Sequence, residues 1–171
     1  MFEQTIYKET LYLDEYKGDT GVIDKHIKHI LEFDKGRKVS NQGGYQSHDI
    51  TFGFNELLEH ILNCFKKINI PVYLGNFWLN INRENDYNQN HIHGSDFFSV
   101  VYFHKVCCEK PALKFEHLIP TLVHMDYKLI PKNQMLVFFS GLQPHSVEPC
   151  PVVGHERISI AFNFKTIRKG F

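Results

Sequence analysis

Residues 157–164 read RISIAFNF, and their alternation decides how the rest of the chain can be arranged. Apolar side chains alternate here with polar or small ones: Ile158, Ile160, Phe162 and Phe164 against Arg157, Ser159, Ala161 and Asn163. A side-chain period of two is typical of a β-strand with one apolar and one polar face. Taken alone, the stretch also fits a half-solvated strand. We expect the polar face to line a cavity and the apolar face to pack outward.

Three histidines precede this strand at a spacing that suits a metal site. His145 lies in FFSGLQPHSVEP, where an apolar run breaks into a turn, so we expect it at a strand end. His91 and His93 lie two residues apart, and in extended backbone both rings project from one face. Neutral imidazoles are good ligands for first-row metals. An isolated His-x-His pair is more often two surface or hydrogen-bonded histidines, but with a distant His145 and the following Arg157 the pattern indicates a mononuclear metal site with an anionic co-substrate.

The composition indicates a single domain, residues 1–171, with a proper core. The chain has 171 residues, of which 43% are hydrophobic, and no composition shift marks a second domain. The formal net charge is +0, so there is no strong signal for nucleic-acid binding. The N-terminal MFEQTIYKET does not resemble a secretory signal, and no apolar run is long enough for a membrane span. These features predict a cytoplasmic protein.

Helices are expected first and strands later. Residues 20–34 and 52–70 repeat apolar side chains at helical spacing, whereas strand-like segments follow Pro71. Helix stripes of this kind are more simply core-facing than functional. We therefore expect an α+β, mainly β fold, in which a helical part of about residues 1–70 buttresses a sandwich or barrel of about residues 71–167.

The cysteines and the remaining histidines give a weaker signal. Four cysteines occur without a CxxC pair, so reduced thiols are expected. Cys107 and Cys108 are adjacent in a Glu-Lys-Pro turn, where a plain loop is a simpler interpretation than a redox pair. Four histidines have no partner at ligand-like spacing and are expected to be surface or structural: His104, His117, His124 and His155.

Longer stretches around these residues resemble a known family. WLNINRENDYNQNHIHGSDFFSVVYF (78–103), IPKNQMLVFFSGLQPHSVEP (130–149) and GHERISIAFNF (154–164) are similar to a largely uncharacterised branch of the Fe(II)/2-oxoglutarate oxygenases. VSNQGGYQSHDI (39–50) is similar to the segment that precedes the barrel in that branch. The resemblance covers about residues 38–165.

The resemblance implies a double-stranded β-helix (jelly-roll, cupin-like) barrel with Fe(II) as cofactor and 2-oxoglutarate as co-substrate. It implies that His91, His93 and His145 hold the iron and that Arg157 grips the far carboxylate of 2-oxoglutarate. The wider superfamily usually has His-x-Asp or His-x-Glu, whereas this chain has His93 at the carboxylate position. Either the three histidines form the metal-binding face, or a carboxylate is supplied elsewhere, with Asp96 as the nearest candidate.

Further residues are expected around this centre. Ser159 is either a second donor to 2-oxoglutarate or a small barrel-interior residue, and Tyr102 and Asn163 are expected to contact the co-substrate, as pocket-lining residues with Asn80 and Asn82. Asp96 or Glu116 are candidates to orient a ligand histidine.

The expected function is a dioxygenase that hydroxylates an unidentified substrate and releases succinate and CO2. Two alternatives stay open: a three-histidine cupin-type dioxygenase that does not use 2-oxoglutarate, and a non-catalytic binding module.

Overall fold

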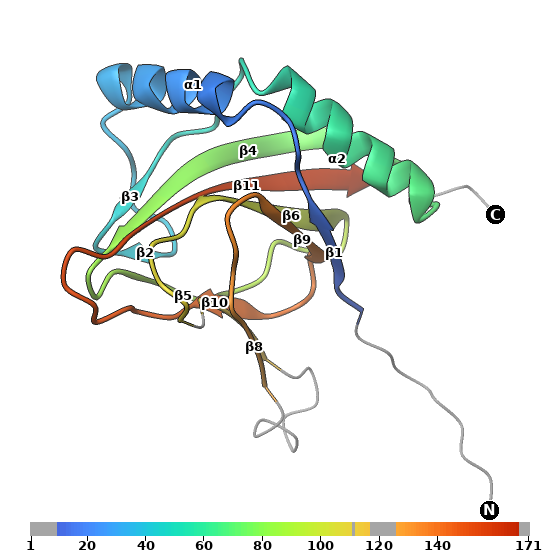
Figure 1. Ribbon diagram of the computed structural model, residues 1–171. Coiled ribbons are helices and arrows are strands. Elements are labelled where there is room, and N and C mark those ends of the chain that lie inside the picture. Colours follow the sequence, from blue (N-terminus) through green and yellow to red (C-terminus); the bar gives the residue numbers. More distant parts are fainter. Residues whose placement is uncertain (1–9, 111, 117–125, 168–171) are drawn as a thin grey trace, which may run out of the picture.

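Two antiparallel sheets and two helices make up the part of the chain that the computed structural model describes, residues 10–110, 112–116 and 126–167 (Figure 1). The helices are α1 (Thr20–Phe33) and α2 (Asn55–Lys67). The strands are β1 (Tyr12–Glu15), β2 (Asn41–Gln42), β3 (Tyr45–Gln46), β4 (Val72–Arg83), β5 (Tyr87–His91), β6 (Phe97–Lys105), β7 (Leu113–Phe115), β8 (Tyr127–Leu129), β9 (Met135–Ser140), β10 (His145–Val147) and β11 (Glu156–Thr166).

The sheets have the strand orders β1-β9-β6-β11-β4-β3 and β2-β5-β10-β7-β8. Except at β3–β4 and β7–β8, successive strands alternate between the sheets. As a result β5 and β10 lie side by side in the smaller sheet, while β4, β6 and β11 form the centre of the larger one. Aromatic and aliphatic side chains from both sheets pack together between them, among them Phe103, Phe115 and Phe139. The expected double-stranded β-helix is confirmed.

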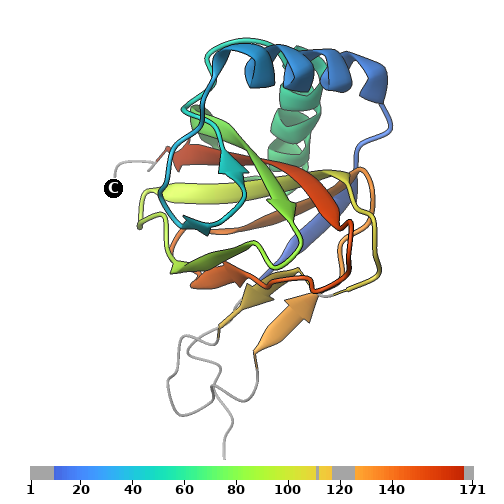
Figure 2. The ribbon, with the colours of Figure 1, turned by 90° about the vertical axis from the view of Figure 1, so that its left-hand side faces the viewer.

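Both helices cover the outer face of the larger sheet (Figures 1 and 2). Asp19 caps α1 by accepting a hydrogen bond from the backbone N–H of Gly21 at 2.8 Å. The inner faces of the helices pack on the apolar face of β11, which carries Ile160, Phe162 and Phe164, as the alternation in residues 157–164 predicts. The largest core cluster is therefore buried between the helices and the larger sheet. The opposite face of β11 points into the barrel.

Three short strands were not expected from the sequence. β1, β2 and β3 come from residues expected to be in the helical part of the chain, and they join the two sheets. Each has only two to four residues, which is too short for a side-chain period to stand out. Within the described residues, neither helix combines the length and the apolar character needed to cross a bilayer.

Candidate metal centre

Two of the predicted ligands face each other across neighbouring strands. His145 is the first residue of β10 and pairs in register with His91, the last residue of β5. The centroids of their rings lie 4.4 Å apart. Pairing of two antiparallel strands thus brings together residues that are more than fifty positions apart in the sequence.

His93 reaches the same place from irregular backbone that follows β5. Its N–H donates to the carbonyl oxygen of Gly141 at 2.8 Å, and the N–H of Gly94 donates to the same oxygen at 3.1 Å. The ring of His93 stacks on Trp78 and lies with its centroid 5.1 Å from that of His91 and 5.0 Å from that of His145. One nitrogen from each of the three histidines lies within 4.8 Å of the others.

The same nitrogen is occupied in all three rings. Nδ1 of His91 donates to the carbonyl oxygen of Gln89 at 2.8 Å, and Nδ1 of His145 donates to that of Gln143 at 2.9 Å. Nδ1 of His93 donates to the side-chain oxygen of Asn163. Because each Nδ1 carries its proton toward an acceptor, the lone pair of each ring is on Nε2. Nε2 of His93 is buried without a hydrogen-bond partner in the described structure, as expected for a metal ligand.

Burial keeps these imidazoles neutral. It lowers the pKa of His145 to about 3 and that of His93 to about 4, and it also lowers the pKa of His91. Neutral imidazole is the form that binds a metal, so these three nitrogens fit a divalent first-row ion such as Fe(II). An ion held by these three nitrogens would keep further coordination positions for a chelating co-substrate and dioxygen.

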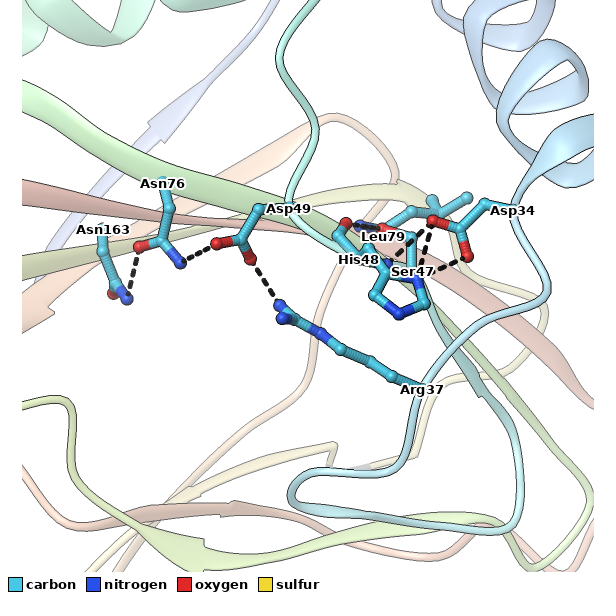
Figure 3. Close-up of polar contacts among 8 residues, drawn as sticks. All are labelled: Asp34, Arg37, Ser47, His48, Asp49, Asn76, Leu79 and Asn163. Atoms are coloured by element: carbon cyan, nitrogen blue, oxygen red, sulfur yellow. Dashed lines mark hydrogen bonds and ion pairs between the residues drawn. The ribbon is translucent and has the colours of Figure 1, made fainter.

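Asn163, which holds His93, is itself held by a chain of polar side chains (Figure 3). Its oxygen also accepts from Ser99 Oγ at 3.2 Å, and its Nδ2 donates to Asn76 Oδ1 at 3.2 Å. Asn76 in turn donates to Asp49 at 3.2 Å, and Asp49 pairs with Arg37. This network fixes which way the Asn163 amide points, and therefore which nitrogen of His93 carries the proton.

The segment that carries Asp49 is fastened to β4 and to the end of α1 (Figure 3). The backbone N–H of Leu79 donates to Ser47 Oγ at 2.9 Å, and the N–H of His48 donates to Asp34 at 2.9 Å. Two side-chain contacts at 3.2 Å add to the Asp34–His48 pair. The polar chain behind His93 thus ends on an anchored loop at the edge of the barrel.

Arg157 lies on the polar face of β11, is 2% exposed, and lines the same cavity as the three histidines. Its Nη2 donates a long hydrogen bond of 3.4 Å to the carbonyl oxygen of Glu148, and no carboxylate of the described residues forms an ion pair with it. Burial lowers the pKa of this guanidinium, but arginine stays charged in proteins. A buried cation without an anionic partner is costly, so this position fits an anionic ligand.

Other predicted residues are divided between the two faces of the larger sheet. Ser159, Asn80 and Asn82 line the cavity beside Arg157, because Arg157 pairs with Asn82 and Ser159 with Asn80 between β11 and β4. Tyr102 does not: it is fully buried on the helix side, with its ring edge-on to Tyr16 at 5.8 Å. The structure therefore does not bring Tyr102 to the cavity, because its neighbours Val101 and Phe103 take cavity-facing positions of β6.

Of the two carboxylates expected near the ligands, that of Glu116 has other partners. Glu116 accepts from Asn90 Nδ2 at 2.7 Å and from Lys114 at 3.4 Å, whereas the Nδ1 atoms of the histidines go to two carbonyls and to Asn163. Asp96 is not part of the three-histidine group, and its carbonyl oxygen accepts from the backbone of Thr166. Asn163 therefore contacts the ligand His93 itself, a role that the sequence analysis had assigned to these two acids.

Some supporting residues carried no signal in the sequence. Asn76 and Asp49 stand in segments where an isolated polar residue is ordinary, and they matter only because β4 pairs with β11 and the loop of residues 47–49 crosses β4. Gly141 is a second case, since its carbonyl fixes His93. Two of the histidines left as structural, His117 and His124, lie outside the described residues.

Residues 76–163, more than half of the chain, match the family model described as "Putative 2OG-Fe(II) oxygenase". No curated protein sequence matches.

Solved structures share the fold at low sequence identity. A viral collagen prolyl hydroxylase, vCPH, from Paramecium bursaria Chlorella virus-1 has a TM-score of 0.63 and 14% identity, over 92% of this chain and 96% of that chain. A prolyl hydroxylase from Trichoplax adhaerens has a TM-score of 0.66 and 13% identity, over 91% and 83%. HygX from Streptomyces hygroscopicus, solved with nickel and 2-oxoglutarate, has a TM-score of 0.65 and 8% identity, over 91% and 82%. At these identities the likeness is one of fold.

Proposed function

We propose that this chain, which belongs to the family of 2OG-Fe(II) oxygenases, holds its iron with His91, His93 and His145 and its co-substrate with Arg157. As a family member it is an enzyme with Fe(II) as cofactor and 2-oxoglutarate as co-substrate. When both are bound they supply oxidative chemistry in which dioxygen is consumed, 2-oxoglutarate becomes succinate and CO2, and one oxygen atom goes to a second substrate.

The observation that carries the ligand assignment is the common orientation of the three rings. In each, Nδ1 is engaged by an oxygen of the protein, which leaves Nε2 as the metal-binding atom. Second partners of this kind fix both the tautomer and the direction of a ligand histidine. In a cluster of surface histidines, hydrogen bonds to the protein would not be expected at Nδ1 of every ring.

The assignment of Arg157 rests on its burial and on the lack of a carboxylate partner for it among the described residues. A guanidinium makes two parallel hydrogen bonds with a carboxylate, so Arg157 is matched to the far end of 2-oxoglutarate. Ser159, on the same face of β11, donates a further hydrogen bond there. The neighbouring Asn80 and Asn82 line the same wall with neutral amide groups, which do not balance the charge of the arginine. The carboxylate of the co-substrate would supply that balancing charge.

The replacement of the usual carboxylate by His93 favours one second candidate, a three-histidine dioxygenase of the cupin type that acts without 2-oxoglutarate. In that case Arg157 would hold a carboxylate of the substrate itself.

We further propose that residues 1–171 are a single domain, because the largest core cluster joins both helices to the larger sheet. We place the enzyme in the cytoplasm, a reducing compartment, because its four cysteines are free thiols.

The test is an anaerobic iron and 2-oxoglutarate titration of wild type, His93→Ala and Asp96→Ala, followed by succinate measurement in air. We expect wild type to bind one iron and to form succinate, His93→Ala to lose iron, and Asp96→Ala to keep it. If Asp96→Ala loses the iron and His93→Ala keeps it, the three-histidine face is wrong. Iron binding without any 2-oxoglutarate binding would favour the cupin-type function.

A further inference from the structure

A second group of potential metal ligands lies at the start of β11 and shares no residue with the three-histidine site. Three cysteines and one histidine form this thiol cluster: Cys107, Cys108, Cys150 and His155. The first two follow β6, whereas Cys150 and His155 belong to the loop between β10 and β11. The cluster therefore joins two loops that adjoin the paired ends of β6 and β11.

The potential ligand atoms are close together. Nδ1 of His155 lies 2.9 Å from Cys107 Sγ and 3.4 Å from Cys108 Sγ, and Cys108 Sγ lies 3.3 Å from Cys150 Sγ. In a tetrahedral zinc site, metal–ligand bonds of about 2.0 to 2.3 Å place ligand atoms roughly 3.5 to 3.8 Å apart. The ligand atoms of Cys107, Cys108 and His155 all lie within 4.8 Å of one another, so these three need only small shifts to admit the ion. Cys150 contacts Cys108 alone and would have to turn its sulfur toward the other two ligands.

The ring of His155 is buried, with its Nδ1 directed at the sulfurs. It is 3% exposed, and its Nε2 has no hydrogen-bond partner among the described residues, while Nδ1 faces two sulfurs. Burial lowers the pKa of His155, and the positive charge of Arg157 lowers it further. The ring is therefore neutral, which is the form that binds a metal ion. The expectation that His155 is merely structural, and that Cys107-Cys108 form a plain loop, came from sequence spacing, which hides contacts between residues over forty positions apart.

The surroundings also suit a thiolate. The backbone N–H of Glu156 donates to Cys107 Sγ at 3.2 Å, which is the kind of contact that stabilises sulfur with negative charge. Cys150 is fully buried and Cys108 half-buried, whereas Cys107 is exposed. An exposed thiol beside two others and a neutral imidazole gives a metal ion a route of entry.

We propose that the thiol cluster is a structural Zn²⁺ site in which three cysteine thiolates and His155 Nδ1 bind the ion. Binding exchanges three thiol protons for one Zn²⁺, so the site carries one net negative charge. His155 is two residues before Arg157. Burial lowers the pKa of that arginine, and the three nearby cysteines act in the opposite direction and raise it. The ion thus clamps the start of β11 and holds Arg157 in a negative surrounding.

The competing chemistry is a disulfide between Cys108 and Cys150. That product would require an oxidant and would leave Cys107 and His155 without a shared role. The two outcomes differ in the number of titratable thiols, because a zinc site yields four per denatured and chelated chain, whereas the disulfide yields two, given the four cysteines of the sequence.

The experiment measures the zinc and iron content of desalted full-length protein by inductively coupled plasma mass spectrometry. Wild type is compared with Cys150→Ser, His155→Asn, His91→Ala and, as a matched buried thiol, Cys64→Ser. We expect one zinc per chain in wild type, in His91→Ala and in Cys64→Ser, and loss of zinc in Cys150→Ser and His155→Asn. Iron should be lost only in His91→Ala, so failure of the iron site and failure of the zinc site are distinguishable.

Two measurements on wild type alone cover the case in which a variant does not fold. Native alkylation should modify Cys107 and Cys108 only after a chelator is added, and Co²⁺ in place of zinc should give the near-ultraviolet absorption of a cobalt–thiolate bond. A Cys108–Cys150 disulfide peptide, four free thiols that alkylate without chelator, or zinc that disappears with Cys64→Ser would each overturn the proposal. The last outcome would move the metal to Asp14, His60 and Cys64.

Discussion

Nδ1 of His93 donates to the side-chain oxygen of Asn163, a residue 70 positions later in the chain and on the opposite sheet. This contact joins the metal-binding turn after β5 to the polar face of β11. Asn163 therefore acts on the metal through His93, and the residues behind it act through Asn163.

Removing this contact should weaken iron binding without unfolding the protein. For Asn163→Ala we expect the dissociation constant of Fe(II) to rise by about 10- to 100-fold, as for other residues that orient a ligand histidine. Anaerobic titration measures it, with the exposed Asn63→Ala on α2 as the control that should leave the affinity unchanged. An unaltered affinity in Asn163→Ala would show that His93 needs no orientation from β11.

Gly141 should tolerate no side chain, because a Cβ there would lie 2.6 Å from the carbonyl oxygen of Gly94 and 2.7 Å from that of Phe97. Gly141→Ala would push away the turn that carries His93. We expect a loss of about 1 to 3 kcal/mol in the free energy of unfolding, together with loss of iron. Thermal melts and metal analysis check this against Gly21→Ala near the start of α1, where the nearest atom is a flexible side-chain oxygen at 3.1 Å. Equal behaviour of the two variants would contradict it.

Arg157 should set the affinity for 2-oxoglutarate and not that for iron. Losing a desolvated charge pair costs on the order of 2 to 5 kcal/mol, so Arg157→Ala should weaken 2-oxoglutarate binding by roughly 30-fold to several thousand-fold. Arg157→Lys should be intermediate, because the charge remains while the two-pronged geometry is lost. Calorimetric titration of the anaerobic iron-loaded proteins tests this. Three equal affinities would make the arginine structural and favour the cupin-type function.

Tyr102 should have no part in co-substrate binding, because it lies on the helix side of β6 and its hydroxyl is buried without a hydrogen-bond partner in the described structure. Tyr102→Phe removes that hydroxyl, so stability should stay the same or rise slightly. The affinity for 2-oxoglutarate should not change. A clear drop in that affinity would restore the expectation that the sequence had suggested.

The Asp34–His48 contact should make stability depend on acid pH. Burial alone would raise the pKa of Asp34, but hydrogen bonds from the N–H groups of Gly36 and His48, with the His48 ring, hold it below its usual 3.8. A carboxyl with a lowered folded pKa stabilises the protein above the unfolded value, and that stabilisation is lost as the pH falls through the folded pKa.

Urea unfolding of Asp34→Asn at pH 7 and near pH 2 separates this contribution. The variant should be less stable than wild type at pH 7, and the difference should shrink at the lower pH. The exposed Glu32→Gln serves as the control. If the difference in free energy of unfolding between wild type and Asp34→Asn does not vary with pH, the variant is destabilised by altered packing and not by the loss of the carboxylate charge.

The sequence determined the elements that have a long repeating pattern. In residues 157–164 the period of two places Arg157, Ser159 and Ala161 on the cavity side and Ile160 and Phe162 under the helices, and the structure agrees. The helices fall where apolar spacing indicates, as residues 20–33 and 55–67. Such patterns are local, because each side chain chooses its face relative to its immediate neighbours.

Only the tertiary structure decided which residues meet. Tyr102 follows the same alternation as its neighbours, but which face of β6 is inside depends on the pairing with β9 and β11. Asn163 and His93, or Cys107 and His155, are ordinary residues until strands from distant parts of the chain pair and bring them into contact. Spacing along a sequence records faces and turns, whereas contacts across sheets depend on the register between strands, and register is a property of the folded chain.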